Sequence, residues 1–161
     1  MRLFSITTFA ALLISTMLPT ATAIGQGLEL NPAPDGASAY FITPAHGETV
    51  TGPVTVRFGL DGMGVAPAGV NQASTGHHHL LIDLPDDEMP ALDRPLPATD
   101  RVVHFGGGQT QVTLDLEPGE HTLQLLLGDH RHVPHAPPVL SERISIRVEA
   151  AEESGADEPG D

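Results

Sequence analysis

The chain has 161 residues and carries 21 acidic side chains against seven arginines and no lysine, which gives a formal net charge of −14 at pH 7. This acidity argues against binding to nucleic acid or anionic membranes and would favour cations, although a solvated acidic surface is the simpler explanation. Because the chain contains no cysteine, disulfides, thiolate metal ligands and cysteine nucleophiles are excluded, and any metal would need imidazole, carboxylate or thioether ligands.

The first 23 residues have the features of a secretory signal peptide. Arg2 supplies a positive start, the apolar run LFSITTFAALLISTML follows, and Ala21-Thr22-Ala23 forms an A-x-A cleavage site. The apolar run is short and is soon broken by Pro19, which argues against a membrane span. We therefore predict cleavage after Ala23 and a periplasmic or secreted protein that is not inserted in a membrane.

One β-domain is predicted over residues 38–148, between a Gly- and Pro-rich exposed linker at 24–37 and a disordered acidic tail at 149–161. Short alternating apolar segments separated by turn residues indicate strands, and no window shows a useful helical period. The strands are expected, in chain order, at 39–44, 54–60, 78–83, 111–116, 121–129 and 143–148, with a turn at 117–120 that makes partners of the fourth and fifth. This rhythm predicts an all-β fold, an antiparallel immunoglobulin-like β-sandwich with long loops.

Two long loops, at 61–76 and 85–100, flank the segment GHHHLLID at 76–83. Long loops on a small domain often carry function. Met63 and Met89 lie in these loops and could serve as thioether ligands of Cu(I), although methionine is common in loops.

Eight of the nine histidines fall between positions 77 and 135. On a strand, His77 and His79 point to one face, while His78 points with Leu80 and Ile82 to the better core face. Two imidazoles about 6–7 Å apart along a strand suit one zinc or copper ion, and the segment GDHRHVPH repeats the H-x-H spacing. If these segments meet at one end of the fold, the expected metal ligands are His77, His79, His104, His130, His132 and His135.

Other polar residues near these histidines could orient the ligands, because a metal-bound imidazole usually donates its second N–H to an acceptor. The residues expected in this role are His78, Asp83, Gln109 and Asp129. His121 is expected to be structural. The glycines of HFGGGQT, Gly106, Gly107 and Gly108, permit a sharp turn or a close approach of the backbone to a ligand, and a plain glycine hairpin is the simpler explanation.

The segments VRFGLDGMGVAPAG, GHHHLLID, HFGGGQT and PGEHTLQLLLGDHRHVPHAPPVLSERI resemble the bacterial exported family known as domain of unknown function 4399. The resemblance covers residues 40–148 and implies a small secreted or periplasmic β-rich domain, without supplying a function. The histidines of the family pattern correspond here to His77, His78, His79, His104, His121, His130 or His132, and His135.

Three functions stay open on the sequence. The favoured one is binding of copper or zinc in the periplasm through the histidines. The second is an interaction module with a structural histidine network, whose partner could be a periplasmic protein, a peptide or a glycan; one tyrosine and no tryptophan provide poorly for sugar stacking. The third is a metal-dependent enzyme, which is less favoured because no nucleophile elbow, H-E-x-x-H motif or paired carboxylate motif is present.

Overall fold

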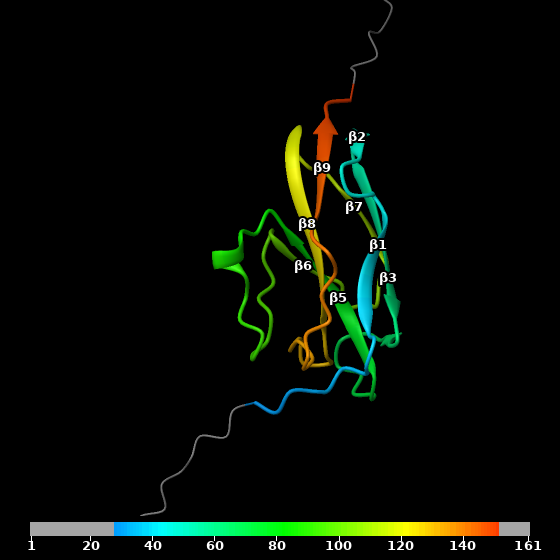
Figure 1. Ribbon diagram of the computed structural model, residues 1–161, viewed down its shortest axis with the longest axis vertical. Coiled ribbons are helices and arrows are strands. Elements are labelled where there is room, and N and C mark those ends of the chain that lie inside the picture. Colours follow the sequence, from blue (N-terminus) through cyan, green and yellow to red (C-terminus); the bar gives the residue numbers. More distant parts are fainter. Residues whose placement is uncertain (1–27, 152–161) are drawn as a thin grey trace, which may run out of the picture.

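The computed structural model describes residues 28–151, which form an all-β fold with one short 3-10 helix at Asp86–Glu88 (Figure 1). The expected signal peptide, the first four residues of the expected linker and residues 152–161 of the expected tail lie outside the described residues. Between residues 28 and 151, no helix is long and apolar enough to span a membrane. The strands are β1 (Ser38–Thr43), β2 (Thr49–Thr51), β3 (Val54–Asp61), β4 (Gly64–Val65), β5 (Thr75–Ile82), β6 (Val102–His104), β7 (Gln111–Leu114), β8 (Gly119–Gly128) and β9 (Ile144–Glu149).

The strands form two sheets that contribute to one core (Figure 1). The smaller sheet has the order β1-β3-β7 and is antiparallel throughout. The larger sheet has the order β2-β9-β8-β5-β4, with β6 also paired to β5, and it is mixed because the β2–β9 and β4–β5 pairs are parallel. The all-β prediction is confirmed, while the short strands β2, β4 and β6 were not predicted.

The expected pairing of the fourth and fifth strands is wrong. β7 pairs with β3 in the smaller sheet, whereas β8 pairs with β5 and β9 in the larger one. The turn that contains Pro118 therefore carries the chain from one sheet to the other. Leu114 at the end of β7 and Leu116 just after it pack against the core from the side of the smaller sheet, and Leu123 and Leu125 of β8 pack against it from the larger sheet. The same alternation of apolar residues is therefore compatible with a hairpin and with the observed crossing between sheets.

The central strands of the larger sheet are buried on both faces. Leu123, Leu125 and Leu127 of β8 face the core between the sheets, while Leu126 packs on the outer face against residues of the long loop. Leu96 and Met89 of this loop, residues 85–100, belong to the outer apolar cluster. Figure 1 shows the loop on the side of β8 away from β1 and β3. Burial on both faces explains the consecutive apolar residues at 80–82 in β5 and 125–127 in β8.

The N-terminal segment lies against the domain over part of the expected exposed linker. Asn31 and Ala33 exchange backbone hydrogen bonds with Ala136: Ala136 N donates to Asn31 O at 2.9 Å, and Ala33 N donates to Ala136 O at 3.2 Å. Figure 1 shows this segment passing beside the loop that follows β8. Residues 31–33 therefore belong to the packed domain.

Candidate metal centre

Strand β5 displays its three consecutive histidines on two faces of the larger sheet. His77 and His79 lie on the outer face with Leu81, which belongs to the outer apolar cluster. His78 points into the core, where its ring contacts Phe58 at a centroid distance of 4.7 Å. His78 thus points inward, as expected, and its ring lies on the opposite face of the sheet from the rings of His77 and His79.

Strand pairing brings a third histidine to the same place. In the antiparallel pairing of β5 with β6, His104 stands directly opposite His79, so the two rings lie side by side with their centroids 5.1 Å apart. His77, His79 and His104 each offer one ring nitrogen, and these three nitrogens all lie within 4.8 Å of one another. The three imidazoles could therefore hold one metal ion.

A fourth ring, that of His132, stands beside these three. Its centroid lies 4.5 Å from that of His104, 5.0 Å from that of His77 and 6.1 Å from that of His79. His132 comes from the loop between β8 and β9, whose first residues follow directly from the β8 partner of His77. Residues more than 50 positions apart in the sequence thus meet at one end of the larger sheet.

Two glycines leave the space that the rings occupy. A Cβ atom at Gly106 would lie 2.4 Å from Cε1 of His104, and one at Gly128 would lie 2.7 Å from Cε1 of His79. Neither glycine has a positive φ, so the requirement is for space rather than for an unusual backbone conformation. Gly106 was singled out from the sequence, whereas Gly128 was missed; its position opposite His77 became visible only with the strand register.

Burial favours the neutral form of the His77, His79 and His104 imidazoles. Desolvation, reinforced by the neighbouring histidines, lowers the pKa of His77 to about 4 and that of His79 to about 3. Burial and the proximity of His132 also lower the pKa of His104. A neutral imidazole has a free lone pair on one nitrogen, which is the form that binds metal ions.

Several nitrogens of the cluster have no hydrogen-bond partner among the described residues. They are both ring nitrogens of His77, Nδ1 of His79 and Nε2 of His104. A buried polar atom without a partner costs roughly 1–3 kcal/mol, so such atoms are uncommon and call for a specific explanation. A bound cation would satisfy one nitrogen of each ring.

His130 and His135, two of the expected ligands, do not join the group of nitrogens that could share an ion. Nδ1 of His130 lies 4.0 Å from Oδ2 of Asp129. His135 is buried and lines a separate cavity of about 210 Å³ together with Asn31 and Asn71. Sequence spacing alone gave no means of separating His132 from these two neighbours in GDHRHVPH.

Two of the polar residues expected to orient the ligands, Asp83 and Gln109, have other partners. Oδ2 of Asp83 lies 2.7 Å from Nδ1 of His121, and Oε1 of Gln109 accepts a hydrogen bond from the backbone N–H of Gly107 at 3.0 Å. Gly108 adopts a φ of 79° in the turn that follows β6, a backbone conformation that favours glycine. The turn itself therefore explains the presence of this glycine. His121 has the structural contacts expected of it.

Asp129 is buried in the loop that carries His132. Burial would raise the pKa of this carboxyl group, but hydrogen bonds from Val133 and Arg131, together with the Arg131 charge, lower it below its usual value. The group is therefore a buried carboxylate, and its negative charge opposes the lowering of the His77 pKa.

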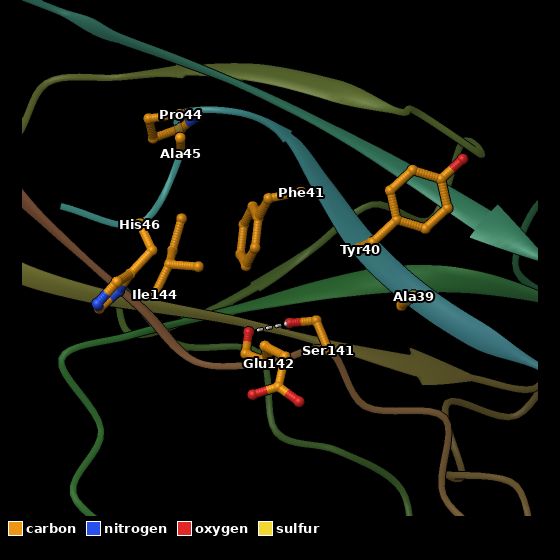
Figure 2. Close-up of a pocket in the computed structure, with 9 residues that line it drawn as sticks. All are labelled: Ala39, Tyr40, Phe41, Pro44, Ala45, His46, Ser141, Glu142 and Ile144. Atoms are coloured by element: carbon orange, nitrogen blue, oxygen red, sulfur yellow. Dashed lines mark hydrogen bonds between the residues drawn. The ribbon is translucent and has the colours of Figure 1, made fainter. Parts of the chain in front are cut away.

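One hollow of the described surface shares no lining residue with the histidine cluster. This cavity of about 350 Å³ is lined by Phe41 of β1, Ile144 of β9, His46 and Glu142, among others (Figure 2). Nδ1 of His46 accepts a hydrogen bond from the backbone N–H of Ser145 at 3.1 Å. The clustered histidines and this hollow therefore belong to different parts of the molecule.

Comparison with known proteins identifies the family. The sequence model of the family described as Domain of unknown function (DUF4399) matches residues 56–149, a span that includes the four clustered histidines and both glycines beside them. No curated protein and no solved structure matches the chain. The match extends over more than half of the chain, and the protein therefore belongs to the DUF4399 family.

Proposed function

We propose that this protein binds a transition metal ion, zinc or copper, through His77, His79 and His104. The observation that carries the proposal is the group of three neutral imidazoles whose nitrogens lie within 4.8 Å of one another. Imidazole is a preferred ligand of both metals, and zinc sites with three histidines are well established in proteins.

The charge distribution supports a cationic ligand. Three neutral imidazoles do not compensate the charge of a divalent ion. The buried carboxylate of Asp129 lies near enough for its negative charge to raise the pKa of His77, and the same charge would favour a cation at the site. The whole chain carries a formal net charge of −14, which attracts cations at long range. Both effects favour uptake of a metal ion over binding of an anion.

The second candidate is an interaction module in which the histidines are structural. Its support is the packing of the rings themselves, since His79 and His104 stack with an interplanar angle of 28°. In that case the unpartnered ring nitrogens lower the stability of the fold, and the packing of the rings has to compensate for that loss. A metal-dependent enzyme, the third possibility, would need an open coordination position on the metal ion in addition to the histidine ligands.

The proposal extends to the fold family and the compartment. Two packed sheets with a shared core support an immunoglobulin-like β-sandwich. The A-x-A site at Ala21–Ala23 supports cleavage after Ala23 and release into the periplasm or the medium. A metal-binding domain in the periplasm would meet metal ions as they enter the cell envelope.

Calorimetric titration of the metal-free, tag-free mature protein with Zn²⁺ and with Cu²⁺ tests the function. We expect one ion per chain for the wild type, an affinity at least about 100-fold weaker for His104→Ala, and no site for the His77→Ala/His79→Ala double variant. His130→Gln is the matched control, because this histidine lies two positions from His132 but outside the three-nitrogen group, and it should bind like the wild type. Absence of binding by the folded wild type, or unchanged binding by His104→Ala, would show that the histidines are structural.

A further inference from the structure

His132 is held in a backbone conformation that side chains other than glycine rarely adopt. Its φ is 67°, in the left-handed region, which costs an ordinary residue on the order of 1 kcal/mol. The conformation is fixed from both sides: the N–H of His132 donates to the Asp129 carbonyl at 2.8 Å, and its carbonyl accepts from the N–H of Leu96 at 2.9 Å. A strained residue that is fixed this firmly points to a function for its side chain.

The carboxylate of Asp129 ties the two residues that flank His132. Oδ1 accepts the backbone N–H of Arg131 at 2.7 Å and that of Val133 at 3.0 Å. Oδ2 accepts Nε and Nη2 of Arg131, at 3.1 and 2.9 Å. Asp129 is 1% exposed, so these charge-assisted bonds form in a low-dielectric setting where they are strong. The hydrogen bonds of the Asp129 carboxylate therefore hold the residues on both sides of His132 in place.

The N-terminal segment forms hydrogen bonds with Asp129 and Arg131 of the same loop. Nδ2 of Asn31 donates to Oδ2 of Asp129 at 2.8 Å, and Nη2 of Arg131 donates to the carbonyl of Glu29 at 2.9 Å. Asn31 and Asp129 are 98 positions apart, and the backbone beside them is joined by the Pro32–Ala136 bridge. The segment that the sequence assigned to a linker thus supports the loop that carries His132.

The spacing of the four ring centroids is closer to that of a tetrahedral site than to that of a square-planar one. A zinc ion bound at about 2.0–2.1 Å by one nitrogen of each of four imidazoles places all six pairs of ring centroids about 5 Å apart, whereas a square plane requires four pairs at about 4.4 Å and two at about 6.2 Å. The six observed distances are 4.5, 4.9, 4.9, 5.0, 5.1 and 6.1 Å. Only the His79–His132 pair departs from the tetrahedral value by as much as 1 Å.

We propose that His132 is the fourth ligand of a tetrahedral, all-imidazole zinc site, and that Asp129 and Asn31 are positioning residues that hold it there. The inference rests on the proposed function, since it specifies the coordination of that same site. The His132 nitrogens lie outside the group within 4.8 Å, so the ring of His132 has to reorient to complete the site when the ion binds. Four protein ligands leave no position for water, which makes the site one for holding zinc rather than for catalysis.

The experiment uses Co²⁺ as a visible substitute for zinc and azide as a probe for an open coordination position. The Co²⁺-loaded wild type should show a visible spectrum that azide does not change, because four imidazoles fill the coordination sphere. Co²⁺-loaded His132→Ala should respond to azide, because loss of the fourth ligand admits an anion. An azide response of the wild type equal to that of His132→Ala would overturn the assignment of His132.

The positioning role is tested by a double-mutant cycle on zinc affinity. We expect Asn31→Ala to weaken zinc binding by about 10-fold in the wild-type background and to have no further effect in the His132→Ala background. Asn71→Ala is the matched control, since this second asparagine lines the same cavity as Asn31 and should leave zinc affinity unchanged. An Asn31→Ala affinity equal to that of Asn71→Ala would refute the positioning role while leaving the metal site in place. A folded wild type that takes up neither Zn²⁺ nor Co²⁺ would remove the proposed function itself.

Discussion

Two glycines leave the space in which imidazole rings of the cluster lie. Gly106 lies two positions after His104, and Gly128 stands opposite His77 across the β5–β8 pairing. Any side chain at either position would occupy the space of a ring. The ligand geometry therefore depends on residues that carry no ligand atom, and substitutions there separate metal affinity from folding stability.

Replacing Gly106 with alanine is expected to displace the His104 ring and to weaken zinc binding by about 10-fold or more. The free energy of unfolding should change by no more than about 1 kcal/mol, because His104 is only partly buried and its ring can rotate away. Zinc titration and chemical denaturation of the metal-free protein measure the two effects separately. Gly107→Ala is the control, since the atoms nearest to its Cβ belong to the flexible Gln109 side chain; equal affinities for the two variants would contradict the role of Gly106.

His78 is buried in the core and lies outside the proposed metal site. Its ring lies in the core against Phe58, neither ring nitrogen has a partner among the described residues, and burial lowers its pKa to about 4. Replacement by leucine, which has a similar volume, should raise the free energy of unfolding at pH 7 by about 1–2 kcal/mol, because an unpaired polar ring leaves the core. Zinc affinity should be unchanged. A destabilised His78→Leu protein would show that this ring makes a polar contact that matters.

At the scale of elements, an ionic contact joins the end of β5 to the start of β8. Nδ1 of His121 lies 2.7 Å from Oδ2 of Asp83, and Nε2 lies 2.7 Å from the carbonyl of Glu117, while Oδ1 of Asp83 accepts the Thr122 N–H. Both ring nitrogens face acceptors, so only the protonated imidazolium satisfies them together. Burial works against the charged form, but the Glu117 carbonyl and the Asp83 carboxylate outweigh it and raise the pKa of His121.

A raised pKa in the folded state means that the His121 contact stabilises the protein at low pH. Its contribution is fully present below the unfolded-state pKa of about 6.5 and is lost as the pH rises through the folded-state value. His121→Gln should therefore cost about 1 kcal/mol at pH 5.5 and clearly less at pH 9, as measured by chemical denaturation. Glu120→Gln, which breaks an exposed pair with Arg147, should change stability little at either pH. A His121→Gln cost that does not change with pH would argue against the ionic contact.

At the scale of the whole molecule, the metal-free domain carries a set of histidines that its fold keeps neutral. The pKa values of His77, His78 and His79 are lowered to about 4, 4 and 3. The unfolded chain therefore binds more protons than the folded one below pH 6.5, so the stability present at neutral pH falls as the pH drops toward 4. We expect a loss on the order of several kcal/mol between pH 7 and pH 4.5 in denaturant titrations, reduced in His78→Leu. Equal stability at the two pH values would contradict the buried, neutral state of these rings.

The sequence was sufficient for the fold class, because alternation in segments such as VTVRFGL shows directly which side chains are buried. It was not sufficient for strand partners: the Pro118–Gly119 turn reads as a hairpin, and only tertiary packing places β7 and β8 in different sheets. Two- and three-residue strands such as β4 and β2 carry too few residues to show any period.

The candidate site was predictable where it depends on strand geometry and not where it depends on loops. The H-x-H spacing placed His77 and His79 on one face, and the histidine in HFGGGQT was a natural third member. Choosing among His130, His132 and His135 required the loop conformation, which is set by Asp129 and by contacts with Asn31 from the other end of the chain. No local pattern in the sequence encodes a contact of that range.

The most direct test of the metal-binding account is the position of the ion itself. A crystal of the mature protein grown with one equivalent of Zn²⁺ should give a single strong anomalous peak at the zinc absorption edge, about 2.0–2.1 Å from one nitrogen each of His77, His79, His104 and His132. A peak at any other group, such as His135 or the exposed acids of Asp86–Glu88, would contradict the account, as would a protein that crystallises from this solution without a peak.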